Sequence, residues 1–527
     1  APPAADVARR AEGLVELNRS GEAIALLEPL VREAPAAAAA EPFACRVRGA
    51  LGRALRRDRQ NARAADLLRP VAERCADPAL RARALYVLAT AVSAKGEREE
   101  AIALFRRFAR EQPQSQLADD ALFAEADLEA RAGRTAEARE ALAALVRDHP
   151  DGDRRDEARF KLAWLERRAG DAAAATAALL AIEEEARDVD AYEHARAAYW
   201  RARLLAAQGE EGQAAARAIW RQLVEDAPAD YYALLARARL AGEGGVALPA
   251  PAAPGPAAPA VGALDPGPLR DDPHYRSGLA LLRSGLPRAA AQELGAVDRS
   301  RIGGGRGDPA PPLLLLAELL DRAGDHRDAH QLLRVEARAA LRRPPLGADR
   351  RIWEVAYPPA HADLVRRLAP PAGVPAELLQ ALMREESALD PEAVSAAGAV
   401  GLTQLMLPTA RSVAHKLKLP RPDRAALMVP STSIQIGSAY LGELLRAFDG
   451  SAALALAAYN AGAAAVTRWR AAGAGLELDE LVEEIPYDET RGYVKRVLRS
   501  YASYRLLSGG AAAASAGAGP ARASPGG

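Results

Sequence analysis

The sequence ALYVLATAVSAKGEREEAIALFRRF occupies residues 84–108, and its pattern of alanines, aromatic residues and one glycine returns at residues 121–145 and 158–182. Each unit reads as a helix, a turn at the glycine and a second helix, because alanines let two helices approach closely and glycine relieves a turn. The interval is 37 residues each time, and the matched positions include Ala84/Ala121/Ala158, Tyr86/Phe123/Phe160, Gly96/Gly133/Gly170 and Phe105/Leu142/Leu179.

Two-helix units with a period of this size indicate an α-solenoid, in which each repeat buries its apolar face on its neighbours. The pattern resembles tetratricopeptide repeats, whose usual period is about 34 residues. Less regular units flank the three clear ones, and residues 226–240, DAPADYYALLARARL, should close the last repeat as a packing helix. We therefore predict a tetratricopeptide-like solenoid of five or six helix pairs over residues 1–240.

The composition bounds the fold and the partners. At 527 residues the chain is too long for one compact core, so we expect two or more domains. Half of the residues are hydrophobic but only 5% are aromatic, which favours alanine-rich helices and a mainly α fold. The 70 Lys and Arg residues balance the 70 Asp and Glu residues, so the net charge gives no reason to expect nucleic acid as a partner. No uncharged apolar run is long enough for a transmembrane segment. The histidines lack metal-ligand spacing and no phosphate-binding glycine motif occurs, so we expect no metal or cofactor.

The rest of the chain divides by composition. Residues 241–268 are dominated by Ala, Gly and Pro, which indicates a linker. Helical patterns return over residues 269–350, which we expect to form a helical linker domain, and residues 351–507 should form a C-terminal domain. Residues 508–527 are small and of low complexity, so we expect a disordered tail.

The two cysteines, Cys45 and Cys75, lie outside any metal-ligand or redox spacing. If residues 45–57 and 62–75 form an antiparallel helix pair, the two thiols lie at the same end of it. A disulfide in an oxidising compartment and two buried free thiols are both open alternatives. The chain starts at Ala1 without a methionine, which fits a processed start, and we expect that an export signal has been removed.

A candidate catalytic carboxylate lies near the start of the C-terminal domain. Residues 374–387 read as a helix with a proline in its first turn. Glu386 falls on the same helix face as three apolar residues, Leu379, Leu382 and Met383. Burial disfavours the ionised form and should raise the pKa of Glu386, as a general acid near neutral pH requires. Glu385 is turned by about 100° and should face solvent.

The segment after this helix is rich in turn residues. Residues 390–410 read DPEAVSAAGAVGLTQLMLPTA, in which Asp390 should be a turn residue and the glycines permit tight turns beside a ligand. The hydroxyl of Ser395 and the amide of Gln404 could bind sugar hydroxyl and acetamido groups, and Met406 could pack on a sugar ring.

Two later blocks could line the same groove. Residues 457–462 read AAYNAG and contain Tyr459, and residues 484–497 read EIPYDETRGYVKRV and contain Glu484. The alternative is that both blocks mainly stabilise the small domain.

Together these three blocks resemble, in the same order, the motifs of the soluble lytic murein transglycosylases. The large periplasmic members of that family have an α-superhelical domain, a helical linker domain and a lysozyme-like catalytic domain, so the resemblance implies a lysozyme-like fold for residues 351–507. Two positions depart from the family pattern. Thr403 stands where an apolar residue is usual, and Leu407 displaces the proline after Met406 by one position.

The resemblance implies an enzyme that cleaves the β-1,4 bond between N-acetylmuramic acid and N-acetylglucosamine in peptidoglycan and leaves a 1,6-anhydromuramic end. Glu386 would be the catalytic acid and base, and the residues that would bind sugar or tune it are Ser395, Gln404, Met406, Tyr459 and, with weaker support, Glu484. A hydrolytic muramidase and a non-catalytic peptidoglycan-binding scaffold are the alternatives. The resemblance also implies a periplasmic location, peptidoglycan strands as the partner and a solenoid surface for proteins.

Overall fold

The computed structural model describes residues 3–33, 41–252, 264–302, 310–347 and 349–517. Over these residues the chain is mainly α-helical, and the expected fold class is confirmed. The extended pairings within them are two isolated bridges in the loop that follows α20 (Ala376–Ser387). None of the described helices has the length and apolarity needed to cross a membrane. The chain divides into two compact units, residues 1–208 and 209–527, which we describe separately.

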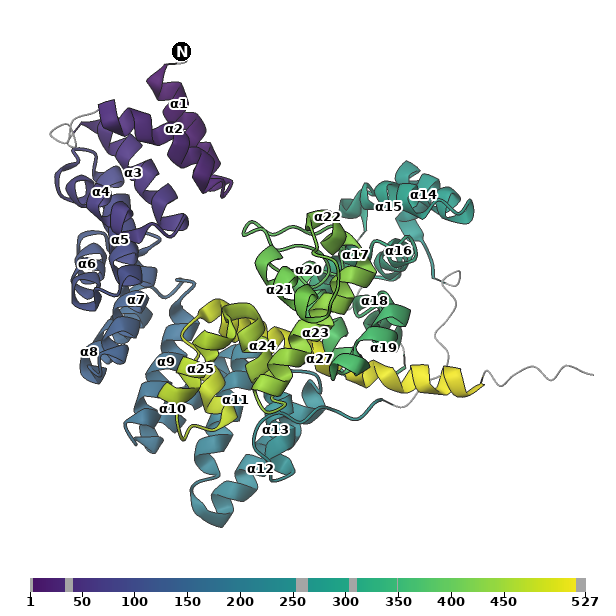
Figure 1. Ribbon diagram of the computed structural model, residues 1–527. Helices are drawn as coiled ribbons and strands as arrows, with labels where there is room; N and C mark the ends of the chain where they lie inside the picture. Colours follow the sequence, from purple (N-terminus) through teal and green to yellow (C-terminus); the bar gives the residue numbers. More distant parts are fainter. Residues whose placement is uncertain (1–2, 34–40, 253–263, 303–309, 348, 518–527) are drawn as a thin grey trace, which may run out of the picture. The chain divides into compact units, whose positions relative to one another are not determined.

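Unit 1 is a row of helices in which each helix packs against the next one along the chain (Figure 1). Its described helices are α1 (Ala4–Glu16), α2 (Ser20–Glu33), α3 (Pro42–Arg57), α4 (Asn61–Arg74), α5 (Pro78–Lys95), α6 (Arg98–Glu111), α7 (Ala118–Arg131), α8 (Thr135–Asp148), α9 (Arg155–Arg168), α10 (Ala172–Ala186) and α11 (Ala191–Leu205).

The sequence repeat corresponds to the helix pairs α5–α6, α7–α8 and α9–α10. The repeated glycines end the first helix of each pair with left-handed backbones, at φ of 87° for Gly96, 79° for Gly133 and 83° for Gly170. This conformation is strained for other residues, which explains why glycine recurs at this position. The matched aromatic and aliphatic side chains pack between the helices, as the solenoid prediction requires. Tyr86 is partly buried, and the buried ones are Phe105, Phe123, Leu142, Phe160 and Leu179.

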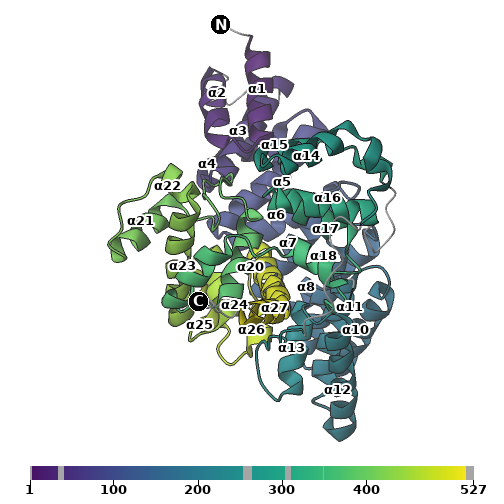
Figure 2. The same cartoon turned by 90° about the vertical axis from the view of Figure 1, so that its right-hand side faces the viewer.

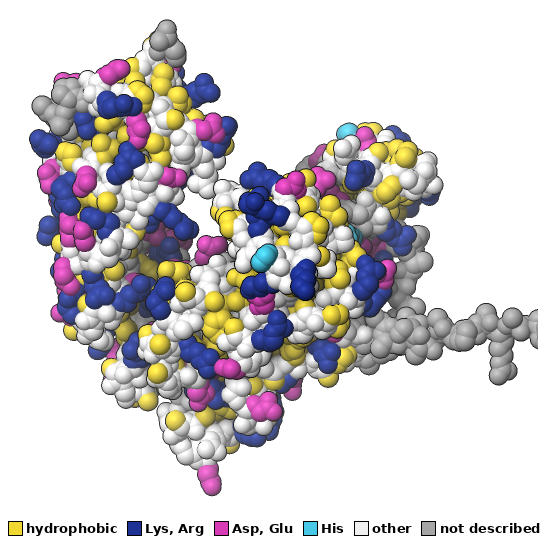
Figure 3. All heavy atoms as spheres, in the orientation of Figure 1, with side chains coloured by type: hydrophobic (Ala, Val, Ile, Leu, Met, Phe, Trp, Pro, Cys, Tyr) yellow, Lys and Arg dark blue, Asp and Glu magenta, His cyan; other side chains and the backbone are white. Residues whose placement is uncertain are grey.

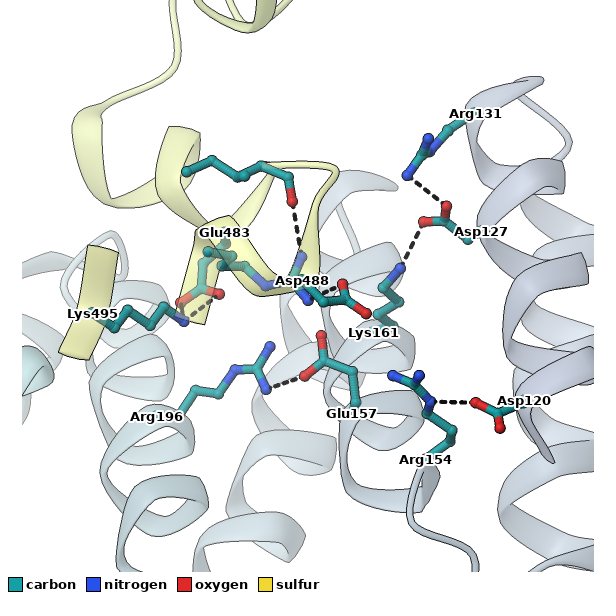
Figure 4. A network of polar contacts seen from close by, with 12 residues as sticks. Asp120, Asp127, Arg131, Arg154, Glu157, Lys161, Arg196, Glu483, Asp488 and Lys495 are labelled. Atoms are coloured by element: carbon teal, nitrogen blue, oxygen red, sulfur yellow. Dashed lines mark hydrogen bonds and ion pairs between the residues drawn. The ribbon is translucent and has the colours of Figure 1, made fainter. Parts of the chain in front are cut away.

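Ion pairs also join the first helices of neighbouring repeats. Arg154 Nε lies 2.7 Å from Asp120 Oδ1, and Lys161 Nζ lies 2.8 Å from Asp127 Oδ1, so that α9 is joined to α7 at two points (Figure 4). These side chains are partly exposed, and each pair contributes at most about 1 kcal/mol. Most of the stability of the row must therefore come from the buried apolar faces.

Cys45 on α3 and Cys75, which follows α4, form a disulfide with a Cα–Cα distance of 5.9 Å. Both cysteines are fully buried. Of the two alternatives left open by the sequence, the structure has the disulfide.

Unit 2 is organised around its last helix, α27. This helix packs against α13, α18, α20, α24 and α26, and Figure 2 shows α20, α24 and α26 beside it. The described helices of unit 2 are α12 (Gly209–Asp226), α13 (Tyr231–Leu240), η3 (Gly267–Asp271), α14 (Pro273–Arg283), α15 (Pro287–Gly295), η4 (Arg299–Arg301), α16 (Pro311–Arg322), α17 (His326–Glu336), α18 (Asp349–Ala356), α19 (Ala362–Leu368), η5 (Pro370–Ala372), α20 (Ala376–Ser387), α21 (Leu407–Lys416), α22 (Arg424–Met428), α23 (Pro430–Ala447), α24 (Ala452–Ala461), α25 (Ala463–Ala472), α26 (Leu478–Glu483) and α27 (Asp488–Gly517).

A buried ion pair fixes α13 to α26 and α27. Lys495 Nζ lies 2.9 Å from both carboxylate oxygens of Glu483 and 2.9 Å from the hydroxyl of Tyr232. Figure 4 shows the Lys495–Glu483 pair. Tyr232 donates its own hydroxyl proton to Glu483 at 2.9 Å, so the buried carboxylate is neutralised and hydrogen-bonded by two different helices.

Two features of the structure bear on the sequence-based segmentation. The solenoid was expected to extend to residue 240. The helices α12 and α13 pack against each other within unit 2, and α13 also contacts α27, so the boundary at residue 240 stays a prediction. The helix α27 extends to Gly517, which is inside the segment expected to be disordered. Parts of the predicted linker and tail, residues 253–263 and 518–527, lie outside the described residues. The other domain boundaries stay predictions.

Candidate active site

Glu386 lies in the last turn of α20, on the face that packs into unit 2. Leu379, Leu382 and Met383 on the same face are fully buried, as their spacing predicts. Glu386 itself is partly buried. The helix presents the carboxyl group at its C-terminal end, where the chain turns away through Ala388 and Leu389, both with positive φ, of 51° and 66°.

Burial raises the pKa of Glu386 to about 7. The negative charges of Glu385 and Glu489 act in the same direction, whereas a hydrogen bond from Tyr493 lowers the pKa because it stabilises the ionised form. A carboxyl group with this pKa is present in both protonation states near neutral pH, which suits a group that must donate a proton and then accept one.

Tyr493 on α27 holds one oxygen of this carboxyl group. Its hydroxyl donates to Glu386 Oε1 at 2.6 Å, and the Tyr493 side chain is buried. Burial raises the pKa of Tyr493 well above its usual value, so the phenol stays protonated and remains a donor. Oε2 of Glu386 accepts no hydrogen bond from the described residues, which leaves it available to a substrate.

Glu385 is not the solvent-facing neighbour that the sequence suggested. Its Oε1 accepts hydrogen bonds from Ser500 at 2.5 Å and from Arg384 Nη1 at 2.7 Å. The prediction was wrong because α27 covers this side of α20, and the helical period of α20 alone carries no information about that contact. Glu385 therefore has a structural role in joining the two helices.

The loop after α20 is fixed to the helix by Ser387. Its hydroxyl lies 3.0 Å from the carbonyl oxygen of Met383 and 2.9 Å from that of Leu402. Asp390 is the turn residue that the sequence predicts, and its Oδ1 accepts a hydrogen bond from the Glu392 amide at 2.8 Å. The loop is thus anchored beside Glu386 at its start and near its end.

Ser395 and Gln404 contact the backbone of this loop. The Ser395 hydroxyl, which is exposed, accepts a hydrogen bond from the Ala399 amide at 3.0 Å. The Gln404 amide donates to the carbonyl oxygens of Ala393, at 3.0 Å, and Gly401, at 2.9 Å. Its carbonyl oxygen accepts no hydrogen bond within the described residues, so it can accept one from a ligand. Met406 is 43% exposed, which permits contact with a sugar ring.

The two departures from the family motif leave the loop intact. Thr403 is fully buried, and its hydroxyl lies 3.2 Å from the hydroxyl of Ser433 on α23, so that each hydroxyl has a partner. The extra residue, Leu407, begins α21 directly after Met406. Beside them, Gly401 has φ of 78°, and a Cβ there would lie 2.1 Å from the carbonyl oxygen of Leu427.

The AAYNAG block is joined to both other blocks. The Tyr459 hydroxyl donates to the carbonyl oxygen of Thr403 at 2.7 Å. Burial, followed by the charge of Glu386, raises the pKa of Tyr459 well above its usual value. The adjacent Asn460 accepts a hydrogen bond from Thr490 on α27 at 2.6 Å.

Comparison with known proteins supports the same assignment. Residues 363–481 match the family described as Transglycosylase SLT domain, and residues 120–152 match a tetratricopeptide repeat. Through its C-terminal part, the chain is similar to the soluble lytic murein transglycosylases. The soluble lytic murein transglycosylase of Escherichia coli K12 is 37% identical over 164 residues, which are 30% of this chain and 25% of that protein. A putative soluble lytic murein transglycosylase of Haemophilus influenzae is 42% identical over 128 residues, which are 24% of this chain and 22% of that protein.

The matched segments thus span about a quarter of these transglycosylases. Two solved structures are similar over more of the chain. An inactive mutant of lytic transglycosylase Slt from Pseudomonas aeruginosa has a TM-score of 0.59 and 23% identity, covering 96% of this chain and 74% of that one. The complex of the 70-kDa soluble lytic transglycosylase with bulgecin A has a TM-score of 0.54 and 21% identity. The match covers 96% of this chain and 73% of that one. At these identities the likeness shows the fold.

The third block contributes residues of the candidate site that the sequence-based prediction missed. Glu489, Tyr493 and Arg496 follow one another at i, i+4 and i+7 on α27, and all three act on the pKa of Glu386. Glu484, the residue of this block that was predicted from the sequence, follows α26. It is not among the groups with the largest effect on the pKa of Glu386. Its role in binding substrate stays a prediction, as do the roles of Ser395, Gln404, Met406 and Tyr459. Reading the block as a helix would have shown the shared face of the other three.

One cluster of carboxylates lies in the described part of unit 1. Oxygens of Asp119, Asp120 and Asp153 lie within 4.8 Å of one another. Asp120 is paired with Arg154, and nothing else in the described residues indicates a bound ion there.

Proposed function

We propose that the protein is a lytic transglycosylase that cleaves the β-1,4 bond between N-acetylmuramic acid and N-acetylglucosamine and forms a 1,6-anhydromuramic end. The observation that carries the proposal is Glu386, a partly buried carboxyl group with a pKa raised to about 7 and one oxygen held by Tyr493. The match of residues 363–481 to the Transglycosylase SLT domain supports the substrate class.

In the proposed reaction, protonated Glu386 donates its proton to the glycosidic oxygen as the bond from that oxygen to C1 of the muramic residue breaks. Positive charge develops on the sugar as in an oxocarbenium ion. The Glu386 carboxylate then accepts the proton of the C6 hydroxyl of the same sugar, while the C6 oxygen bonds to C1 and closes the anhydro ring. Glu386 is protonated again, and no water is consumed.

The surroundings of Glu386 fit this use of one carboxyl group. Tyr493 stabilises the carboxylate that exists between the two steps, because its hydroxyl donates to the ionised form. Most glycosidases need a second carboxylate about 5 to 9.5 Å away. The adjacent Glu385 is paired with Arg384 and bonded to Ser500, so it is not available for that role.

The proposal is tested by digesting purified peptidoglycan sacculi and weighing the released muropeptides. We expect wild-type protein to release products that are lighter by one water than hydrolysed muropeptides. Glu386→Gln should release none, and Glu392→Gln, which changes an exposed carboxylate in the following loop, should behave as wild type. Products with the mass of hydrolysed muropeptides would show a muramidase instead. Activity of the Glu386→Gln variant would refute the assignment of Glu386 as the catalytic acid.

We further propose that the protein acts in the periplasm, where peptidoglycan lies. The names of the curated relatives, which call them soluble and murein transglycosylases, support this location. Removal of an export signal and binding of protein partners by the solenoid stay predictions.

A further inference from the structure

Two arginines of unit 1 lie on neighbouring helices without a close counter-ion. Arg53 is on α3 and Arg83 is on α5, and these two helices pack against each other. Figure 3 shows cationic and acidic side chains intermixed over the drawn face of this unit, so a cation without an acidic partner stands out. We call Arg53 and Arg83 the arginine pair.

Arg53 is the more buried member of the arginine pair. Its side chain is 16% exposed, and its Nε has no hydrogen-bond partner among the described residues. The nearest described carboxylate, Glu16, lies 3.9 Å away and is shared with Arg57 at the same distance. Burial lowers the pKa of Arg53, and the positive charge of Arg83 lowers it further. A guanidinium group that has lost water without gaining a counter-ion is costly, and an incoming anion would offset that cost.

Arg83 is exposed, and no carboxylate in the described part of the chain lies within ion-pair distance of it. In the next two repeats the corresponding positions, 37 and 74 residues later, are the acids Asp120 and Glu157. Asp120 lies 2.7 Å from Arg154, and Glu157 is likewise paired with an arginine of α11. The residue one repeat before Arg154 is Leu117. The repeat that contains α5 therefore has the opposite charge at this position and no residue to neutralise it.

Arg46 shows which kind of ligand this face can hold. It precedes Arg53 by seven residues, so the two side chains leave the same side of α3. The guanidinium group of Arg46 binds both oxygens of the Glu12 carboxylate, at 2.8 and 2.6 Å. Such a bidentate contact is the preferred geometry between arginine and a carboxylate. The described residues supply a carboxylate of this kind to Arg46 but not to the arginine pair.

We propose that the arginine pair binds an acidic segment of a partner protein, with one side-chain carboxylate at each guanidinium group. Arginine clusters are a recurrent means of recognising acidic motifs, and a solenoid offers an extended surface to a peptide. Because Arg53 is mostly covered, a slender carboxylate side chain can reach it, whereas a flat lipid surface reaches only exposed cations. The inference concerns unit 1 alone and does not depend on the proposed function.

Binding is measured by fluorescence anisotropy with the full chain and two labelled octapeptides, one of alternating Glu and Ser and one of alternating Gln and Ser. We expect wild-type protein to bind the Glu peptide and not the Gln peptide. The double variant Arg53→Gln/Arg83→Gln should bind the Glu peptide about three- to tenfold more weakly, as the loss of two ion pairs would give. The difference should disappear in about 1 M salt, where the screening length is about 3 Å.

The control is the double variant Arg107→Gln/Arg139→Gln. It removes the same number of charges from α6 and α8 of the same unit, where each arginine is paired with a glutamate, at 2.8 and 2.5 Å. This variant should bind the Glu peptide as wild type does. An equal loss in the two double variants would show that only the net charge of the unit matters, and it would overturn the inference.

The melting temperature separates binding from a structural role. The two like charges of the arginine pair repel each other, so their removal should leave the melting temperature unchanged or raise it. If the double variant melts at a lower temperature, the single variant Arg83→Gln decides, because that side chain is exposed and its loss disturbs folding least. Wild-type affinity of Arg83→Gln for the Glu peptide would refute the inference. So would a wild-type protein that binds neither peptide, or that binds vesicles of anionic lipid but not the Glu peptide.

Discussion

The variant Tyr493→Phe isolates the hydrogen bond that tunes the candidate acid. It removes the hydroxyl that donates to Glu386 Oε1 at 2.6 Å and keeps the buried ring, so packing between α20 and α27 is retained. The hydroxyl favours the ionised form of Glu386, and its removal therefore raises the pKa of that group above the wild-type value of about 7.

The size of the effect follows from the energy of the bond. A hydrogen bond to a charged group contributes about 1.5 to 3 kcal/mol. A pKa shift of one unit corresponds to about 1.4 kcal/mol, so the pKa of Glu386 should rise by about one to two units. The reaction starts from protonated Glu386, and activity is lost as pH rises through its pKa. The alkaline limb of the profile should therefore move to higher pH in the variant.

The rate at the optimum should also fall, by about tenfold or more, because the carboxylate formed after the first step loses its donor. The assay is the release of muropeptides from sacculi between pH 5 and 10, as initial rates. Tyr501→Phe is the control, since it removes a phenol from the same helix that makes no hydrogen bond to Glu386. An alkaline limb that stays in place, or moves to lower pH, would refute the assignment of the pKa to Glu386.

Two further variants and the reduction of the disulfide test the scaffold. Lys495→Met should lower the free energy of unfolding of unit 2 by about 3 to 5 kcal/mol, because Glu483 stays buried without its partner. Adding Glu483→Gln should restore most of this stability, as measured by a denaturant titration. Reducing the Cys45–Cys75 disulfide should cost unit 1 about 3 to 4 kcal/mol, seen as a lower melting temperature, and an unchanged melting temperature would contradict a stabilising bond. Gly401→Ala should reduce muropeptide release at least tenfold, because its Cβ would lie 2.1 Å from a carbonyl oxygen, and full activity would show that the loop can shift.

The repeats of unit 1 could be predicted because their information is local. A residue such as Gly133 recurs where the backbone must take positive φ, and the small and aromatic positions recur because each pair meets the same neighbours. The end of the solenoid could not be predicted in the same way. Residues 231–240 have the apolar pattern of one more packing helix and pack against α12, but they also contact α27, more than 200 residues later in the chain.

In the candidate site, too, local features could be predicted from the sequence and contacts between distant helices could not. The raised pKa of Glu386 results from burial, which its place on an apolar face of its own helix predicts from the sequence. The contacts of Tyr493 with Glu386 and of Ser500 with Glu385 depend on how α20 and α27 pack against each other. No period within either helix encodes that register, so Tyr493 was missed and Glu385 was placed in solvent.

The helix α27 connects the candidate acid to the anchor of α13. Tyr493 and Lys495 are two residues apart and point to nearly opposite sides of the helix, because each residue turns it by about 100°. One side holds Glu386 through the phenol, and the other is fixed by Glu483 and Tyr232. The buried ion pair therefore resists rotation of α27, and a small rotation would lengthen the bond from Tyr493 to Glu386. A residue with no contact to substrate can in this way set the protonation of the acid.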